Sequence, residues 1–208
     1  MIRLETQNGK IELISYSENA LLGELIREVE NHRTSSRLGK ECEFCGKCCY
    51  DEVPLTGADL AAFGESLYQI PSVPSAQSRE DGISRLISEH KLDRKTAALL
   101  FEYNTGEAVT PKRQTGGGCI HLLGSRCRIY EKRPMACRFY NCIMGENLKI
   151  LYENIIRQGI WHSYYVLGKI PAASIAGNPF LSGKPERIPL RLFDSDISGA
   201  LESLFSYF

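Results

Sequence analysis

The stretch Cys42-Glu-Phe-Cys45-Gly-Lys-Cys48-Cys49 carries more information than any other part of this chain. It places thiols at two-residue spacings, which allow several sulfur atoms to converge on one centre. A second group of cysteines lies further along the chain, at Cys119, Cys127, Cys137 and Cys142. Thiolate sulfur is a preferred ligand of borderline and soft metals. The two groups therefore predict a metal or iron–sulfur site, with all eight cysteines as candidate ligands.

The composition is that of an ordinary soluble globular protein. Of 208 residues, 43% are hydrophobic and 24% are charged, so the chain can bury a core without help from a metal. Twenty-five basic residues balance twenty-five acidic ones, which leaves no overall field to attract a nucleic acid or an anionic membrane. No stretch has the pattern of a signal peptide or a membrane span. We therefore expect a cytoplasmic protein whose thiols stay reduced, which argues against four disulfides.

Local patterns predict most of the secondary structure. Residues 2–15 are typical of a β-hairpin that turns at Asn8-Gly9. Ser17 is expected to cap a helix that runs to about His32. A second helix should begin with the capping-box pair Thr56 and Asp59, and should end near Tyr68. The other expected elements are a loop at 70–79, helices at 80–91 and 97–101, and strands at 107–113 and 120–123. A helical turn after Pro134, a helix at 146–167, an irregular segment at 170–193 and a helix from Ser195 complete the prediction.

Together these elements predict an α+β protein that is predominantly helical. A small, irregular, cysteine-rich core organised by metal is expected between the N-terminal β-hairpin and flanking helices. We expect a single domain over 1–208, with the hairpin and first helix in 1–38. The metal-binding core should occupy 39–145, and a C-terminal helical extension 146–208.

The first cysteine group matches a ferredoxin pattern only in part. Cys42, Cys45 and Cys48 fit the first three positions of a bacterial C-x2-C-x2-C run. The fourth cysteine of that run should follow after three residues and precede proline, but here Cys49 is adjacent and Tyr50 follows. The remaining ligand is therefore expected from the second group. Side chains of adjacent residues diverge in most backbone conformations, so Cys48 and Cys49 are expected to have different roles. The spacings rank five cysteines first: Cys42, Cys45, Cys48, Cys137 and Cys142.

Basic residues gather around the second cysteine group. Residues 111–140 contain seven lysines and arginines against one acid, Glu131. Arg128, Arg133 and Arg138 are candidates to donate hydrogen bonds to the cofactor's sulfur ligands. The alternative is a solvated basic face. His121, two residues after Cys119, is a candidate ligand or acid–base group, although a lone histidine between apolar residues is more often part of the core.

The cysteine pattern and its surroundings resemble a known family. Two blocks carry the resemblance: Cys42-x2-Cys45-x2-Cys48-Cys49 with Pro54-Leu55-Thr56-x2-Asp59-Leu60, and Cys119-x7-Cys127-Arg-Ile-Tyr130-Glu-Lys-Arg133-Pro134-x2-Cys137-Arg138-Phe139. They resemble the CxxCxxCC (YkgJ-like) family over about residues 40–142. Its members are described as zinc- or iron-chelating proteins, which implies a cysteine-cluster metalloprotein. One branch, the flagellin lysine N-methylases, has a related pattern in a longer chain, but this chain shows no methyl-donor fingerprint.

Three functions remain open from the sequence. The first is an iron–sulfur protein, of the [4Fe–4S] type, with a redox or electron-transfer role. The irregular separations of seven, nine and four residues in the second group favour it over zinc, which prefers paired C-x2-C knuckles. The second is a zinc-stabilised structural or protein-interaction module. The third is a metal-dependent protein-modifying enzyme related to the lysine N-methylases. The expected partner is a protein, either a redox partner or a complex subunit, and not a nucleic acid or a membrane.

Overall fold

The computed structural model describes residues 1–35, 46–70, 108–139 and 143–194, and six single positions between 81 and 94. Cys42, Cys45 and Cys142 lie outside the described residues. So do all or most of the predicted loop at 70–79, the helices at 80–91 and 97–101, and the helix from Ser195. Within the described parts the architecture is mixed α+β, as predicted, with short antiparallel strand pairs packed beside helices.

The N-terminal hairpin is confirmed. Strand β1 (Ile2–Gln7) pairs antiparallel with β2 (Lys10–Tyr16), with a register irregularity between Arg3 and Leu4. Asn8 and Gly9 both have positive φ, 51° and 74°, which is the combination that a tight two-residue hairpin turn requires. The alternation along β2 buries Ile11 and Leu13 in the core.

The first helix begins later than the sequence predicted. Helix α1 spans Leu22–Ser35, so the expected N-cap at Ser17 and the end at His32 are both wrong. The Ser17 hydroxyl instead accepts a hydrogen bond from the amino terminus of Met1 at 2.8 Å. At the actual start, the Glu24 side chain accepts a hydrogen bond from the Leu21 N–H at 3.0 Å. Glu24 is the third residue of the helix, and its carboxylate satisfies the free N–H of Leu21, the residue before the helix.

The second helix begins as predicted and ends early. Helix α3 spans Gly57–Phe63, and Thr56 and Asp59 form the full capping box at its start. The residue at its end, Gly64, has φ 69° and ψ 146°, which breaks the helix before the predicted end at Tyr68. After the 3-10 turn η2 (Glu65–Leu67), strand β3 (Tyr68–Gln69) pairs with β4 (Thr110–Pro111). In the described part of the strand predicted over 107–113, β4 contains Thr110 and Pro111.

The cysteine-bearing part is built from very short elements. They are the 3-10 turn η1 (Lys47–Tyr50), the strand pair β5 (Leu122–Leu123) and β6 (Arg126–Cys127), the 3-10 turn η3 (Tyr130–Lys132) and helix α6 (Met135–Phe139). The predicted turn at Gly124-Ser125 and the helical turn after Pro134 are confirmed. Elements of two to five residues cannot be stable alone, so their position depends on what they pack against.

Helix α7 (Glu146–Val166) is the long element of the structure and agrees with the predicted helix. Its predicted apolar face is fully buried, at Leu148, Leu151, Tyr152, Ile155 and Ile156. Four 3-10 turns follow, where an irregular segment was predicted: η4 (Ala172–Ile175), η5 (Pro179–Ser182), η6 (Pro185–Arg187) and η7 (Leu190–Phe193). In the described part of the chain no helix has the length and apolar character needed to cross a membrane.

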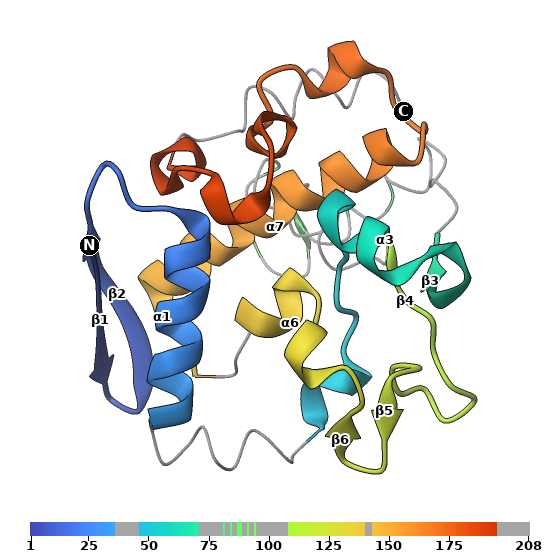
Figure 1. Cartoon of the computed structure of the whole chain (residues 1–208), viewed down its shortest axis with the longest axis horizontal. Helices are drawn as coiled ribbons and strands as arrows, with labels where there is room; N and C mark the ends of the chain where they lie inside the picture. Colours follow the sequence, from blue (N-terminus) through green and yellow to red (C-terminus); the bar gives the residue numbers. More distant parts are fainter. Residues whose placement is uncertain are drawn as a thin grey trace.

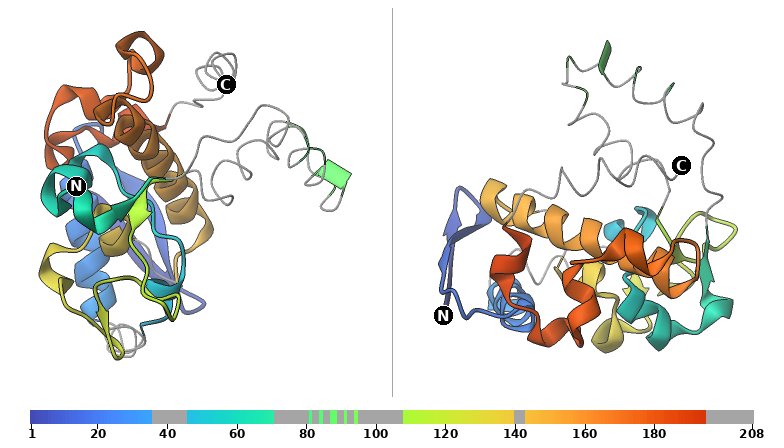
Figure 2. Two further views of the ribbon diagram at one scale, coloured as in Figure 1. Left: turned by 90° about the vertical axis from the view of Figure 1, so that its right-hand side faces the viewer. Right: turned by 90° about the horizontal axis from the view of Figure 1, so that it is seen from above.

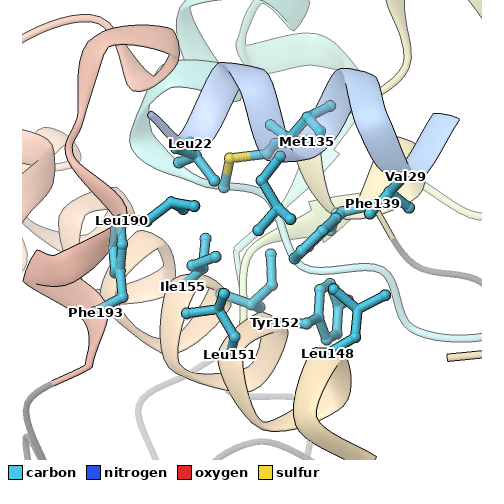
Figure 3. Close-up of a cluster of buried hydrophobic side chains, with 14 of the residues drawn as sticks. Leu22, Val29, Met135, Phe139, Leu148, Leu151, Tyr152, Ile155, Leu190 and Phe193 are labelled. Carbon is cyan, nitrogen blue, oxygen red and sulfur yellow. The ribbon is translucent and has the colours of Figure 1, made fainter. Parts of the chain in front are cut away.

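The core lies between α1, α6 and α7 (Figure 1). Figure 3 shows Leu22 and Val29 from α1, Met135 and Phe139 from α6, and Leu148 to Ile155 from α7 meeting in one apolar cluster. Leu190 and Phe193 close it from the C-terminal turns. Seen from above in Figure 2, the hairpin lies at one end of α7 and α3 at the other. A smaller cluster of Leu55, Leu60, Tyr68 and Val109 lies under α3.

The hairpin also caps the N-terminus of α7. The residue before the helix, Gly145, offers no side chain to its free N–H groups, and Glu12 of β2 supplies one instead. Glu12 Oε1 accepts a hydrogen bond from the Glu146 N–H at 3.1 Å. A Cβ atom on Gly145 would come within 1.9 Å of the Glu12 carboxyl group, so a larger residue here would displace the cap. The backbone around Gly145 is held as well, since Ile11 exchanges hydrogen bonds with Ile143 and Gly145.

Replacing Glu12 with alanine should therefore destabilise the protein. The expected loss is about 1 kcal/mol of unfolding free energy, the usual cost of removing a helix cap with a favourable charge at the N-terminus. Urea denaturation of wild type and Glu12→Ala measures it, with the exposed Glu18→Ala as the control for lost charge. Equal losses in the two variants would contradict the capping role.

Candidate metal centre

Two segments far apart in the sequence run side by side in the structure. The Leu55 N–H donates to the Val109 carbonyl at 2.7 Å, and β3 pairs with β4 a few residues further on. At the cysteines themselves, the Cys119 N–H donates to the Cys49 carbonyl at 2.8 Å. The first and second cysteine groups, which are independent in the sequence, therefore meet at this point.

Arg113 joins the same two segments through its side chain. Its Nη1 donates to the carbonyl of Tyr50 at 2.9 Å and to that of Gly117 at 2.7 Å. The neighbouring Gln114 side chain donates to the carbonyls of Cys119 and Leu122, at 2.9 and 2.5 Å. These bonds fix the glycine-rich turn that leads into Cys119.

The β5–β6 hairpin brings Cys127 beside Cys119. Cys127 lies opposite Leu122 in the strand pair, and Cys119 accepts a hydrogen bond at Sγ from the His121 N–H at 3.5 Å. Backbone N–H donors of this kind stabilise thiolate sulfur in metal sites. Gly46, with φ 60°, approaches the backbone of Ser125, so the turn η1 packs directly on the hairpin.

Asp59 connects helix α3 to the helix that carries Cys137. Its Oδ2 completes the capping box by accepting bonds from the N–H and the hydroxyl of Thr56, both at 2.9 Å. Its Oδ1 accepts a bond from the Met135 N–H, the first residue of α6, at 3.0 Å. One carboxyl group thus caps two short helices and sets the position of Cys137 relative to the first cysteine group.

The five described cysteines, Cys48, Cys49, Cys119, Cys127 and Cys137, are half-buried free thiols. The Cys49 thiol donates a hydrogen bond to the Cys48 sulfur, which lowers the pKa of Cys48 and raises that of Cys49. Burial raises the pKa of Cys119 and of Cys137, and the charges of the neighbouring sulfurs raise both further. Such mutual effects require the thiols to be close together, and a bound cation would relieve the repulsion between them.

The bond between Cys48 and Cys49 corrects one expectation. Their side chains were expected to diverge, as they do in extended backbone, but residues 47–50 form a 3-10 turn that turns both thiols to the same side. The prediction that the two cysteines have different roles remains a prediction.

Two of the three candidate arginines, Arg133 and Arg138, are half-buried and paired with a carboxylate. Arg138 binds both oxygens of Glu30 on α1, with Nε at 3.2 Å and Nη2 at 2.9 Å. Arg133 reaches Glu30 with Nη2 at 3.3 Å and lies over the ring of Tyr130, 3.7 Å from its centre. The positive charge of Arg133 contributes to the lowered pKa of Cys48 and partly opposes the rise in the pKa of Cys137. These two residues are therefore not a solvated basic face.

Arg128 is placed differently. It is exposed, and its Nη2 donates to the Ile120 carbonyl at 3.1 Å. Hydrogen bonds from these three arginines to a cofactor's sulfur ligands remain a prediction, because in the described part of the structure the three arginines donate to oxygen atoms.

Glu30 and Arg33 of α1 were not identified from the sequence. Arg33 is 5% exposed and donates to the Tyr130 hydroxyl at 3.2 Å. One signal was available for it: Leu22, Ile26, Val29 and Arg33 follow helical spacing, so Arg33 falls on the buried face of α1. An arginine at a core position requires a polar partner from elsewhere in the fold. Glu30 had no comparable signal.

His121 is 7% exposed and lies against Phe63 of α3, with 5.5 Å between ring centres. Its Nε2 atom is buried and has no hydrogen-bond partner among the described residues. Burial lowers its pKa, so the ring is neutral at pH 7. This surrounding is that of a core histidine, and the ligand or acid–base role remains a prediction.

The described residues alone do not provide a complete ligand set. Within residues 46–70, 108–139 and 143–194, no three His, Cys, Asp or Glu side chains form a group able to hold a metal ion. The thiol chemistry fits a soft metal or an iron–sulfur cluster. A complete set requires ligands from Cys42, Cys45 or Cys142, which the described residues do not include.

Comparison with known proteins identifies the family. The model of the CxxCxxCC family, described as "Putative zinc- or iron-chelating domain", matches residues 41–155, more than half of the chain. The chain belongs to the CxxCxxCC family. No curated protein and no solved structure matches it significantly.

The structure explains residues of the CxxCxxCC pattern that carry no sulfur. Thr56 and Asp59 cap α3 and α6, and Pro134 directly precedes α6. Tyr130 and Arg133 stack on one another, and Arg138 binds Glu30. These contacts fix α6, which carries Cys137, against α1 and α3, so the second cysteine block of this chain contains positioning residues as well as thiols.

Replacing Arg113 with glutamine should loosen the contact between the two cysteine segments. Loss of its bonds to Tyr50 and Gly117 is expected to lower the local stability by about 1 kcal/mol, which corresponds to about fivefold faster alkylation of Cys49 and Cys119. Iodoacetamide labelling of the reduced, metal-free protein, followed by mass spectrometry, measures each thiol. Lys112→Gln is the control for lost charge, and equal rates in both variants would contradict the proposed role of Arg113.

Asp59 should make the stability depend on pH. Burial raises its pKa, although the bonds from Thr56 and Met135 oppose this shift. A carboxyl group whose pKa is higher in the folded state favours folding in acid, and this contribution is lost as the pH rises through the folded pKa. The unfolding free energy of wild type minus that of Asp59→Asn should therefore fall as the pH rises from about 4, near the pKa of an unfolded aspartate, through the folded pKa. Denaturant titrations measure it, with the exposed Asp51→Asn as control. A difference that rises with pH would mean that the folded pKa is lowered.

Proposed function

We propose that this chain binds an iron–sulfur cluster of the [4Fe–4S] type and transfers electrons through it. The observation that carries the proposal is the bond from the Cys119 N–H to the Cys49 carbonyl, which brings thiols of both cysteine groups together. Cluster ligands commonly come as a closely spaced run plus a remote cysteine, and this is the arrangement that such a contact supports.

The candidate ligands are all eight cysteines. Cys48, Cys119 and Cys137 influence one another's charge in the described part of the chain. Cys42, Cys45 and Cys142 would supply the rest of the set. When bound, the cluster would supply one-electron redox chemistry, while the protein would hold it in place and exclude water from part of it.

The surroundings suit an anionic centre that lies close to the surface. All five described thiols are half-buried, so a cluster among them would be close to solvent and to a redox partner. Arg133, with a side chain 10% exposed, offers a buried positive charge beside Cys48 and Cys137. Charge and hydrogen bonds near the sulfurs are the main protein contributions to cluster potential.

Zinc is the second candidate, and one observation favours it. The N–H of His121 donates to Cys119 Sγ, a backbone hydrogen bond of the kind that stabilises the thiolate ligands of structural zinc. In that case the metal would stabilise the segments around the cysteines, and the protein would act as an interaction module.

Analysis of protein purified without oxygen distinguishes the two. We expect a brown protein with about four iron and four sulfide per chain, and an EPR signal on reduction. Cys48→Ser and Cys119→Ser should lose most of the iron, while Ser125→Ala, an exposed position on the same hairpin, should retain it. A colourless protein with stoichiometric zinc would overturn the iron–sulfur proposal.

A further inference from the structure

The seven basic side chains between residues 111 and 140 differ in exposure. Arg113, Arg133 and Arg138 are half-buried and bonded to carbonyl or carboxylate oxygens within the fold. Arg126, Arg128 and Lys132 are exposed, although Arg128 also donates to the Ile120 carbonyl, and Lys112 is half-buried. The exposed basic residues are accompanied in this stretch by one acid, the exposed Glu131. The chain as a whole is neutral, so this surface is a local positive patch.

The β5–β6 hairpin has an inner and an outer pair of side chains. Leu122 and Cys127 form the inner pair, and Leu122 is 6% exposed because it packs beside Gly46 and Gly118. Leu123 and Arg126 form the outer pair, since successive side chains of a strand point to opposite faces. Leu123 is 69% exposed, which is an unusual place for a leucine on a two-residue strand.

This outer face is on the opposite side of the strand pair from the Cys127 side chain. A molecule that contacts Leu123 and Arg126 touches the backbone of the strand that carries the Cys127 thiol. Figure 1 shows the hairpin at the edge of the molecule, away from the long helix α7 and the apolar core. An exposed apolar side chain with basic side chains nearby can combine an apolar contact with electrostatic steering in a small, transient interface.

We infer that the β5–β6 hairpin, with Leu123 and Arg126 on its outer face and the exposed Arg128 and Lys132 in the segment that follows, is the docking surface for an acidic electron-transfer protein. The positive charges select an acidic partner and steer its approach, and Leu123 supplies the apolar contact. The inference rests on the proposed function, because the partner would exchange electrons with the cluster held near Cys127.

Charges nearby favour a protein over a nucleic acid. Asp51 and Glu52 are exposed next to the turn η1, which packs on the hairpin, and Glu131 is exposed beside Lys132. A phosphate backbone would meet these carboxylates along with the cations. A folded acidic protein can instead place its carboxylates over the arginines and leave the acids at the rim.

Binding to an acidic flavodoxin, a small one-electron carrier, tests the surface. Calorimetry at low ionic strength with the full-length, metal-loaded protein should show binding that weakens as salt is added. The double variant Arg126→Glu and Lys132→Glu should weaken it by about tenfold or more, and Leu123→Ser by a few-fold. The double variant Lys169→Glu and Lys184→Glu carries the same charge change at exposed positions elsewhere and should bind like wild type.

Several results would overturn the inference. They are no binding of flavodoxin, equal losses in the two double variants, or tighter binding of a DNA duplex than of flavodoxin. Melting curves of each variant establish that it is folded. The same titrations on zinc-loaded protein separate this inference from the proposed function: hairpin-dependent binding in a protein purified with zinc supports the docking surface and overturns the iron–sulfur cluster.

Discussion

The hydrogen bond between the Cys119 N–H and the Cys49 carbonyl is the contact on which the site depends. It closes a loop of about seventy residues, and the entropic cost of such a loop is about 4 kcal/mol. No single hydrogen bond offsets that cost. It is offset by the antiparallel contacts along the two segments, at Leu55 and Val109 and between β3 and β4, and by the core that fixes α6 on α1 and α7. A metal with ligands in both segments would add to this stabilisation.

Charged groups act together with the apolar core to position the second cysteine group. Glu30, Arg133 and Arg138 link α1 to α6, and Tyr130 lies between Arg33 and Arg133. Buried ion pairs contribute little net stability, because desolvation of the charges offsets most of their attraction. Their contribution is geometric: a bidentate arginine–carboxylate pair tolerates little movement, so it fixes the orientation of a helix too short to fix itself.

Sequence patterns predicted the elements whose cause is local. Asn8-Gly9, the Thr56–Asp59 capping box and the apolar face of α7 act within a few residues, and all three are found. The errors arose where a distant or competing group acts instead. Glu24 takes the place of the expected cap at Ser17, and Gly64 ends α3 early.

The candidate site was predictable in kind but not in arrangement. Thiol spacing indicated a metal-binding chain, and the family match supports this. The roles of Arg113 and Glu30 depend on partners 63 and more than 100 residues away, which no local pattern reveals. For the same reason, the spacing distinguished candidate ligands by type and order but not by which sulfurs lie together.

The carboxyl group of Asp59 has a further consequence for how the protein opens. Helices α3 and α6 have seven and five residues, and each takes its N-terminal cap from this one side chain. Unfolding either helix removes the geometry that caps the other, so the two should open as one cooperative unit in amide hydrogen exchange. Because Cys137 lies within that unit, local opening would expose the thiol and the small cluster under α3 in the same event.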